Sequence, residues 1–536
     1  MCGIAVVHEF DPTPERLATA CEIGERMLSP IAHRGPDGQG SRLVGSTWLG
    51  HTRLAIVDLA GGRQPMTSAD GGTVAGRWVA ANGEIYNHDD LRDQLGGPFA
   101  TSSDSEVILH VVAARGLDGI HDLRGMYAFA VAAEDGTDDG TDDGGEGDGG
   151  LVLARDPLGV KPLYWARYDG RLLAASELGA FPPEVRPAVE EFPPGHHWTP
   201  RTGLQPFVDL RTDPLGTDEP VGPSYTTREE AHAAIRGTLV EAVRARMMAD
   251  VPIGVFLSGG LDSSLVAAIM VREIEHVSGP GTVVRSFAAG TPDSPDLVAA
   301  RRVAAYLGTE HHERVYTDDE VIDVLPAVVR SIESYEPSLV RSAVPNYLLS
   351  ELAAQHVKVV LTGEGADELF AGYHHLRELD EAALADALVE GVQVLHHLNL
   401  QRADRVSMAF GLEARVPFLA REMLAVAQRV PVAWKLLGED GQEQAQEKAI
   451  LREAFAGWLP DSVLWRRKEQ FGDGSGTADV MTRRAEAFVP DDEWESVRLE
   501  GLPSARSREE LGYQRIFADH LGGIRAEQVL GRFATA

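Results

Sequence analysis

The chain has 536 residues, an apolar fraction of 43% and a formal net charge of −33. Its length exceeds the ~100–200 residues of one ordinary domain, so two domains are expected. The acidic balance argues against a nucleic-acid partner, which needs a dense basic surface, and the short apolar runs argue against a membrane protein, whose spans need ~20 apolar residues.

The N-terminal stretch MCGIAVVHEF carries one of only two cysteines, Cys2; the other is Cys21. Two cysteines are too few for a disulfide framework, and their scarcity predicts a protein of the reducing cytoplasm. The apolar stretch ends at His8-Glu9, too early for the core of a secretory signal. Cys21 lies on the apolar side of a predicted helix, where a small core residue is the simpler interpretation.

Residues 1–210 are predicted to form the first domain, because short β-like segments alternate there with turns rich in Gly, Asp and Pro. Two amphipathic helices are predicted at Pro14–Leu28 and Glu106–Arg115, where apolar residues recur at helical spacing. The predicted strands are Gly3–Val7, Gly45–His51, Arg77–Asn82, Ala128–Ala132, Leu151–Ala154 and Leu172–Ala175.

Two segments interrupt these patterns. EDGTDDGTDDGGEGDGG (134–150) is an acidic low-complexity tract between two predicted strands, and a solvated hairpin extension explains it better than a metal site. DLRTDPLGTDEPVGPS (209–224) is rich in Pro, Gly and Asp. Residues 211–224 are therefore predicted to link the first domain to a second domain at 225–536.

The second domain has a different pattern, in which helices alternate with apolar strands. This alternation predicts an α/β domain with a parallel sheet covered by helices, and the C-terminal third is predicted to be mostly helical. The predicted helices are Thr227–Ala249, Ser264–Glu275, Pro295–Leu307 and Ala343–Gln355, and the predicted strands are Pro252–Leu257, Val283–Ala288 and Val357–Leu361.

The strand at Pro252–Leu257 runs into SGGLDSS (258–264), and a helix follows. Such a Gly-rich turn against a helix N-terminus presents backbone N–H groups to an anion. No lysine follows the glycines, so this is not a GxxxxGK[ST] loop. A lone SGG would indicate only a capped turn, but strand, loop and helix together resemble the PP-loop of ATP pyrophosphatases, which cleave ATP between its α and β phosphates. The residues assigned to ATP here are Leu257, Ser258, Gly259, Gly260, Asp262, Ser263 and Ser264.

A second strand ends in TGEGADELFAGY (362–373), where Glu364, Asp367 and Glu368 crowd one turn. If the two strands are neighbours, Asp262 and Asp367 can hold one Mg²⁺ against pyrophosphate oxygens. Thr362 and Gly363 are assigned to ATP in the same loop. An acidic surface turn is the weaker alternative, because apolar residues lead into and out of the segment.

Further segments extend the pattern, and with them the chain resembles the glutamine-dependent asparagine synthetases nearly end to end, apart from the acidic tract. The additional signatures are MCGIA, HRGPDG (33–38), ANGEIYN (81–87), SDSEVIL (103–109), RDPLGVKPLYW (155–165), EARVPFL (413–419) and RRKEQFGDG (466–474). The resemblance implies an N-terminal-nucleophile glutaminase with four αββα layers, followed by a PP-loop ATP-pyrophosphatase domain with a parallel sheet.

For the first domain, the resemblance implies that Met1 is removed and that Cys2 attacks the carboxamide of glutamine. The freed α-amine, with a reference pKa of ~7.7–8.0, can take the thiol proton, and the thiol's reference pKa of ~8.5 predicts that modest activation suffices. The matched residues are Asn82 and Gly83 for the oxyanion hole, Arg53 for the glutamine α-carboxylate, and Glu84 and Asp104 for its α-ammonium. For Arg53 alone, a surface salt bridge would be the default interpretation.

For the second domain, the resemblance implies ATP and Mg²⁺ as cofactors, an acyl-adenylate, and ammonia that arrives through an internal tunnel. Glu364 matches a glutamate proposed to deprotonate ammonium or the tetrahedral intermediate, and a structural carboxylate is its alternative. The matched phosphate-contacting residues are Arg341 in SLVRSAVPNY, Lys448 in EKAILREAF and Lys468 in RRKEQF.

The leading hypothesis is therefore the conversion of aspartate, ATP and glutamine into asparagine, AMP, pyrophosphate and glutamate. Ser338-Leu339 stand where some members carry two threonines, so the same chemistry on another carboxylate in a specialised pathway stays the alternative. A β-lactam-synthetase-like cyclase needs no glutaminase site, and a regulatory relative needs neither site, so both are disfavoured. The expected partners are these small molecules and, because relatives are often dimers, a second copy of the chain.

Overall fold

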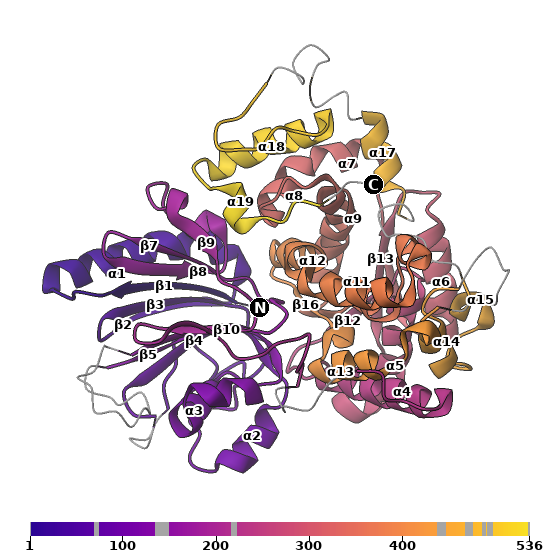
Figure 1. The fold of residues 1–536 in the computed structure, drawn as a ribbon, viewed down its shortest axis with the longest axis horizontal. Helices are drawn as coiled ribbons and strands as arrows, with labels where there is room; N and C mark the ends of the chain where they lie inside the picture. The colour runs from indigo at the N-terminus through magenta and orange to yellow at the C-terminus, as the bar shows by residue number, and fades with distance from the viewer. Residues whose placement is uncertain are drawn as a thin grey trace.

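The computed structural model describes residues 2–68, 74–134, 150–215, 222–436, 446–466, 475–484, 489 and 497–533. They form two lobes that lie side by side in Figure 1. Residues 135–149 of the acidic tract, 216–221 of the predicted linker, and Lys468 lie outside the described residues. Among the helices in the described ranges, none combines the length and the apolar character that a membrane span requires.

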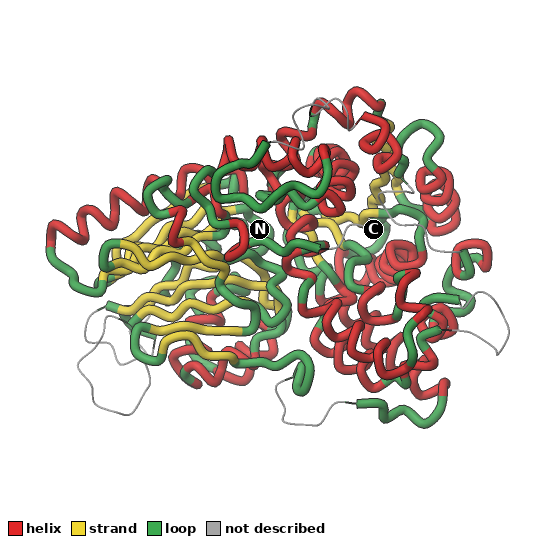
Figure 2. Tube along the Cα trace, turned by 45° about the horizontal axis from the view of Figure 1, so that its top comes forward, coloured by secondary structure: helices red, strands yellow, loops and turns green. Residues whose placement is uncertain are grey.

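The first lobe contains two antiparallel sheets stacked face to face between helices (Figure 2). One sheet has six strands in the order β2-β3-β1-β8-β7-β9, and the other has five in the order β11-β10-β6-β5-β4. The strands are β1 (Gly3–Glu9), β2 (Gly38–Val44), β3 (Thr47–Arg53), β4 (Arg77–Ile85), β5 (Gly125–Ala133), β6 (Leu151–Arg155), β7 (Tyr164–Tyr168), β8 (Arg171–Ala175), β9 (Val189–Glu191), β10 (His196–Thr199) and β11 (Gly203–Pro206).

Strand β1 shows why these residues form a sandwich. Ile4 and Val6 belong to the core between the two sheets, whereas Ala5 and Val7 belong to the core under helix α1 (Pro14–Leu28), because successive strand residues point to opposite faces. Helices α2 (His88–Leu95) and α3 (Glu106–Arg115) cover the second sheet (Figure 1). The αββα arrangement is confirmed, and α1 and α3 have the predicted bounds.

The second lobe is built on a five-stranded sheet in the order β14-β13-β12-β15-β16, and all its pairs are parallel, as predicted. On β15, Val359 and Leu361 pack on one face and Val360 on the other, so helices cover both faces. The strands are β12 (Ile253–Phe256), β13 (Arg285–Gly290), β14 (Glu310–Val315), β15 (Val359–Leu361) and β16 (Glu413–Arg415). The helices are α4 (Arg228–Ala245), α5 (Leu261–Ser278), α6 (Pro295–Leu307), α7 (Asp318–Asp323), α8 (Leu325–Ile332), α9 (Pro337–Ala354), α10 (Ala366–Phe370), α11 (Glu381–Gln393), α12 (Asn399–Met408), α13 (Arg421–Arg429), α14 (Ala449–Ala454), α15 (Asp461–Leu464), α17 (Thr477–Arg484), α18 (Arg508–Leu521) and α19 (Ala526–Val529).

The largest differences from the sequence prediction in the second lobe concern β14, β16 and α9, while α4, α5 and β13 differ by one to four residues at their ends. Strands β14 and β16 were not predicted, because β14 has the polar edge sequence EHHERV and β16 is only three residues long and carries two charges. Helix α9 begins at Pro337, earlier than the predicted Ala343, since a proline is well suited to the first helical position. It also continues through Pro345.

A buried ion network joins the two lobes. The Arg34 guanidinium is fully buried; it donates to the Cys2 carbonyl oxygen (3.0 Å) and to a Glu177 carboxylate oxygen (2.7 Å) and pairs with Asp404 of α12 (2.9 Å). Arg405, the next residue of α12, pairs with Glu177 at 2.9 Å. Buried side chains of the two lobes therefore pair with one another across the interface.

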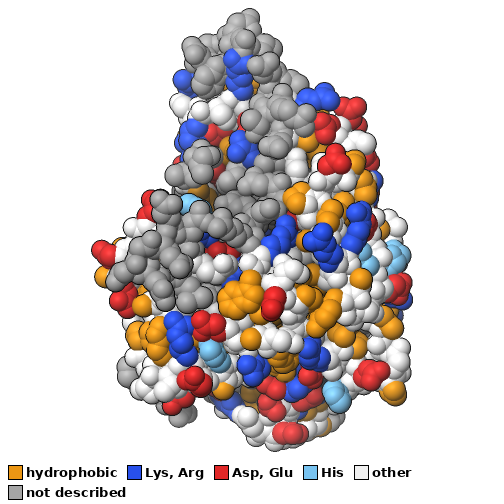
Figure 3. All heavy atoms as spheres, turned by 90° about the vertical axis from the view of Figure 1, so that its right-hand side faces the viewer, with side chains coloured by type: hydrophobic (Ala, Val, Ile, Leu, Met, Phe, Trp, Pro, Cys, Tyr) orange, Lys and Arg blue, Asp and Glu red, His pale blue; other side chains and the backbone are white. Residues whose placement is uncertain are grey.

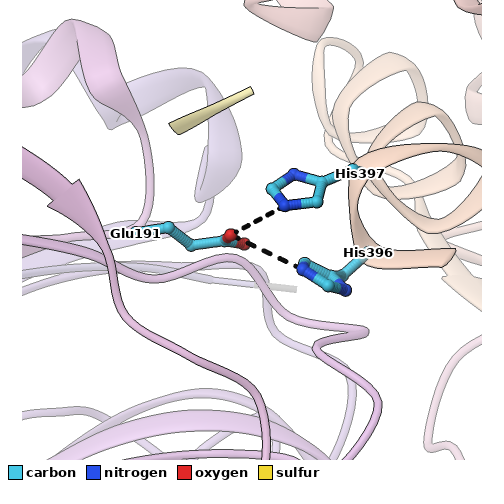
Figure 4. A group of neighbouring side chains, drawn as sticks. All are labelled: Glu191, His396 and His397. Atoms are coloured by element: carbon cyan, nitrogen blue, oxygen red, sulfur yellow. Dashed lines mark ion pairs between the residues drawn. The ribbon is translucent and has the colours of Figure 1, made fainter. Parts of the chain in front are cut away.

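Glu191 at the end of β9 makes a second contact with the other lobe (Figure 4). One of its carboxylate oxygens lies 3.1 Å from His397 Nε2 and 3.5 Å from His396 Nε2, while the other accepts a hydrogen bond from Arg155 (2.7 Å). Burial lowers the pKa of His397 to about 4, although the Glu191 carboxylate acts in the opposite direction and raises it.

Figure 3 shows basic, acidic and apolar side chains interspersed over the visible, described part of one face of the second lobe. No continuous basic stripe of the kind that tracks a phosphate backbone crosses that described surface.

The buried ion network predicts that replacing Asp404 by the nearly isosteric asparagine lowers the free energy of unfolding substantially. Asp404→Asn removes one of the two carboxylates that pair with the buried Arg34 guanidinium, and it removes the carboxylate that pairs with the buried Lys161, so we expect a loss of about 3–5 kcal/mol and a lower midpoint of urea unfolding. Asp519→Asn is the matched control, since Asp519 forms an exposed ion pair with Arg330 at 3.8 Å and should cost about 0–1 kcal/mol. Equal midpoints for the two variants would contradict the structural role of the network.

Candidate active sites

The first site surrounds Cys2, which directly precedes the central strand β1. Its backbone nitrogen donates to Asn82 Oδ1 (3.1 Å), and its sulfur lies 3.9 Å from the Leu54 carbonyl oxygen. Burial raises the pKa of the Cys2 thiol to about 11. Burial thus acts against the thiolate, and a base close to the sulfur would favour its formation.

Asn82 and Gly83 lie on β4 of the second sheet, opposite Cys2. Asn82 is fully buried, and within the described ranges its Nδ2 has no hydrogen-bond partner. Gly83 has φ +144°, and a Cβ there would lie 1.9 Å from the Met126 carbonyl oxygen, so only glycine fits. The pair offers a buried N–H donor beside a closely packed backbone, which suits the stabilisation of an oxyanion.

The remaining predicted residues of this site are brought close to it. Arg53 ends β3, and its guanidinium donates to the carbonyl oxygens of Asp58 (2.7 Å) and Leu59 (3.1 Å). Glu84 is buried, and its carboxylate lies 3.6 Å from the guanidinium of Arg415 in the second lobe.

Burial raises the pKa of Glu84 well above its usual range, and the nearby Glu413 and Asp104 carboxylates raise it further. Asp104 accepts a hydrogen bond from the Ile85 N–H (2.7 Å). This concentration of carboxylates favours a ligand that brings a positive charge, such as an α-ammonium.

The second site is a cavity of about 300 Å³ at the carboxyl ends of β12 and β15. The two strands are neighbours, which is the condition that a Mg²⁺ site shared by the two loops requires. Ten of the predicted residues line it: Leu257, Ser258, Gly260, Asp262, Ser263, Thr362, Gly363, Glu364, Asp367 and Lys448. Three predicted residues, Gly259, Ser264 and Arg341, do not line it.

The two loops touch each other at Gly363. A Cβ at this position would lie 2.8 Å from both Asp262 Cβ and the Ser263 backbone nitrogen. Within the first loop, the Ser258 N–H donates to Ser263 Oγ (3.3 Å), and the Gly260 N–H donates to Ser258 Oγ (3.3 Å). Asp262 and Ser263 belong to the first turn of α5, where the helix dipole favours an anion.

Lys448 brings the carboxylates of the two loops together. Its ammonium lies 2.5 Å from Asp262 and 2.6 Å from Asp367. Burial alone would lower the pKa of Lys448, but the two carboxylates outweigh it and raise the pKa. Because the oxygens of both carboxylates converge on one cation, and because hard oxygen donors suit Mg²⁺, these residues fit a divalent cation beside phosphate.

Arginines that the sequence did not single out complete the cavity wall. Arg402 pairs with Glu364 at 2.5 Å, and Arg466, the first residue of RRKEQFGDG, lies 3.4 Å from Asp296. Arg402 has no local sequence signal, since it lies within an ordinary amphipathic helix. Arg341 instead pairs with Glu509 of α18 at 2.5 Å, so the structure does not bring it to the cavity.

Comparisons with known proteins cover both lobes. The family model "Asparagine synthase" matches residues 234–383 and 377–528, and "Glutamine amidotransferase domain" matches residues 1–193. A "Probable asparagine synthetase [glutamine-hydrolyzing]" of Dictyostelium discoideum is 37% identical, with coverage of 96% of this chain and 93% of its own. The "Probable asparagine synthetase [glutamine-hydrolyzing]" of Schizosaccharomyces pombe is 38% identical, and the alignment covers 96% of this chain and 93% of the relative. "Asparagine synthetase B [glutamine-hydrolyzing]" of Escherichia coli is 38% identical, with coverage of 97% and 91%.

The contact between the two loops predicts the effect of one added methyl group. Gly363→Ala pushes the second loop away from Asp262 and Ser263, so we expect ATP with Mg²⁺ to bind at least about tenfold more weakly, or 1.4 kcal/mol, by isothermal titration calorimetry. Gly237→Ala is the matched control, because that helical position has open space and the change should not weaken binding. Unchanged affinity in Gly363→Ala would contradict the assignment of this cavity to ATP.

Proposed function

The chain belongs to the family of glutamine-hydrolysing asparagine synthetases, and we propose that it converts aspartate, ATP, glutamine and water into asparagine, AMP, pyrophosphate and glutamate. The observation that carries this proposal is the presence, in one chain, of a buried cysteine site and a cavity at the carboxyl ends of β12 and β15 that holds converging carboxylates and a lysine. A homodimer and a cytoplasmic location remain predictions from the sequence.

In the proposed first half-reaction, removal of Met1 turns the Cys2 nitrogen into an α-amine. That nitrogen is the donor to Asn82 Oδ1, so the asparagine side chain would hold the amine beside the thiol. The amine takes the thiol proton as the sulfur attacks the glutamine carboxamide, which answers the need for a base that the buried thiol creates. The proton then passes to the leaving ammonia, and water hydrolyses the resulting thioester to release glutamate and the Cys2 thiol.

Other residues orient the glutamine. Asn82 Nδ2 and the Gly83 N–H would donate to the oxyanion that forms on the carboxamide carbon. Arg53 would bind the α-carboxylate, and Glu84 and Asp104 would bind the α-ammonium, whose charge offsets their own.

We propose that ammonia moves to the second lobe through the apolar core between the lobes. Leu54, whose carbonyl contacts the Cys2 sulfur, and Leu257, which lines the second cavity, belong to the same buried cluster. Neutral NH₃ can pass such surroundings, whereas NH₄⁺ would pay a large desolvation penalty.

In the proposed second half-reaction, the loop 258–264 and the second loop bind the phosphates of ATP. Asp262 and Asp367 would hold Mg²⁺, which, when bound, supplies positive charge to the departing pyrophosphate. Lys448 neutralises the same oxygens, and Lys468 is proposed to do so as well. A pyrophosphate contact by Arg341 requires that its ion pair with Glu509 open.

Glu364 is the proposed base for the attacking nitrogen. It lines the cavity, and its ion pair with Arg402 fixes the direction of the carboxylate. Ser338 and Leu339 also line the cavity, so they contribute to the choice of the carboxylate that is adenylylated.

Separate sites predict separable activities. Cys2→Ala should lower glutamine-dependent synthesis at least about 10³-fold, because it removes the nucleophile, and should leave ammonia-dependent synthesis within about twofold. Both rates are measured by asparagine formation. Cys21→Ala, on the partly buried face of α1, is the control and should keep both activities. Parallel loss of both rates in Cys2→Ala would refute the division of labour.

A substitution in the second lobe should have the opposite effect and remove synthesis while glutamine hydrolysis persists. Asp262→Asn should reduce ATP-dependent pyrophosphate release at least about 10²-fold, because it removes a charge that balances Lys448 and the metal, while glutamine hydrolysis persists. Asp293→Asn, an exposed change near the end of β13, is the control. Retained pyrophosphate release in Asp262→Asn would remove this residue from the proposed metal site.

The acceptor is tested with purified enzyme, ATP, Mg²⁺, glutamine and a panel of carboxylates, by measuring pyrophosphate and the amide product. We expect pyrophosphate release to require aspartate and to give asparagine. Release that depends on another carboxylate would replace aspartate by that compound while leaving the two-site chemistry intact.

A further inference from the structure

Glu191, His396 and His397 form a compact group where the two lobes meet (Figure 4). The glutamate ends β9 in the first lobe, and the histidines belong to a short helical turn, Leu395–His397, in the second lobe. One ligand atom of each residue lies within 4.8 Å of the other two. Within the described ranges, this is the single group of three His, Cys, Asp or Glu side chains with that property.

The distances within the group suit a transition-metal ion. A tetrahedral ion with bonds of about 2.0–2.1 Å to nitrogen and oxygen holds its ligand atoms about 3.3–3.4 Å apart. One Glu191 carboxylate oxygen lies 3.1 Å from His397 Nε2 and 3.5 Å from His396 Nε2, on either side of that value. The longer distance exceeds the about 2.7–3.2 Å of an ordinary N–H···O hydrogen bond, so such a bond does not account for the position of His396.

Packing fixes the two histidines next to each other, with their ring centroids 4.1 Å apart. A Cβ built on Gly159 would lie 2.9 Å from His396 Cβ, and one built on Gly531 would lie 2.8 Å from His397 Cβ. The backbone therefore packs directly against the base of each histidine. His396 Nδ1 is buried and has no hydrogen-bond partner in the described ranges, so Nε2, which faces Glu191, is the nitrogen that this ring offers to a ligand.

The Glu191 carboxylate is held from its other side by Arg155. Its second oxygen accepts a hydrogen bond from this guanidinium (2.7 Å), which also donates to the carbonyl oxygens of Phe192 (2.6 Å) and Lys161 (2.8 Å). A partner of this kind orients a metal-binding carboxylate. Because the positive charge of Arg155 opposes a second cation nearby, we expect weaker binding than in a closed zinc site with four protein ligands.

We propose that Glu191, His396 and His397 bind one Zn²⁺ ion at the contact between the lobes, with one carboxylate oxygen and both Nε2 atoms as ligands and water in the fourth position. Two imidazoles and a carboxylate suit Zn²⁺, whereas Mg²⁺ prefers oxygen donors. All three side chains are partly exposed, so the ion and the water can reach them. This site is additional to the proposed synthetase chemistry and shares no residue with it.

A bound ion would tie β9 to the turn that precedes α12. In that helix, Arg402 pairs with Glu364 in the second cavity and Asp404 pairs with Arg34 of the first lobe. Zn²⁺ would therefore add to the contacts that hold the two lobes together. Because an ion that binds only the folded chain stabilises it, Zn²⁺ should also raise the unfolding temperature.

The test is isothermal titration calorimetry of the full-length protein with Zn²⁺, in excess Mg²⁺ that competes for the carboxylates of the ATP cavity. A cysteine thiolate can also bind Zn²⁺, so the titration is repeated in Cys2→Ala, which should keep the proposed ion. His397→Gln should bind that ion at least about tenfold more weakly, because it removes one ligand. His312→Gln is the matched control and should bind Zn²⁺ unchanged, since His312 contacts Glu310 at 3.1 Å but belongs to no group of three ligands in the described ranges.

A second readout separates coordination from folding. In the Cys2→Ala protein, Co²⁺ should give the visible absorption band of a four-coordinate ion, and the band should persist with His312→Gln and vanish with His396→Gln or His397→Gln. Zn²⁺ should raise the Tm of the same proteins that give the band and of no others. Absence of Zn²⁺ binding to Cys2→Ala, equal Zn²⁺ affinity in His397→Gln and the unmodified protein, or a Co²⁺ band that survives both histidine substitutions would overturn the proposal.

Discussion

The arrangement of both sites depends on the contacts of the buried Arg34 guanidinium. It holds the carbonyl of Cys2 on one side and the carboxylate of Asp404 on the other. Asp404 belongs to α12, and two residues earlier the same helix carries Arg402, which pairs with Glu364 in the second cavity. A short, rigid helix thus connects the backbone of the proposed nucleophile to the proposed base of the other site.

The two sites differ in the sign of the charge that their surroundings favour. Around Cys2, burial and nearby carboxylates disfavour negative charge, so the thiol stays protonated until a base acts and a cationic substrate group is favoured. In the second cavity, Lys448, Arg402 and Arg466 provide positive charge for phosphates, although the whole chain carries a net charge of −33. Local charge, and not the total, therefore decides which ligands each site accepts.

The elements with a strong local pattern were predictable. Helices α1, α3 and α6 have the predicted bounds. Side chains cap the N-termini of α1 and α6, whereas α3 is an apolar run whose first seven residues are all buried. The adjacency of β12 and β15 was a condition of the predicted Mg²⁺ site and not itself a prediction, and the structure meets that condition. By contrast, β16 could not be recognised, because its buried Glu413 and Arg415 are stabilised by each other at 2.6 Å and not by an apolar pattern.

By itself, the sequence determined the chemistry that each segment offers: a cysteine next to the initiator methionine, a Gly-rich loop between strand and helix, and carboxylates at a second strand end. Only the tertiary structure decided how those groups behave. Burial raises the Cys2 pKa, Lys448 joins the two aspartates, and Arg341 pairs with Glu509. The physical reason is that desolvation and charge pairing depend on which residues meet in space. Arg34 and Asp404, which are 370 positions apart in the chain, meet only when both lobes have folded.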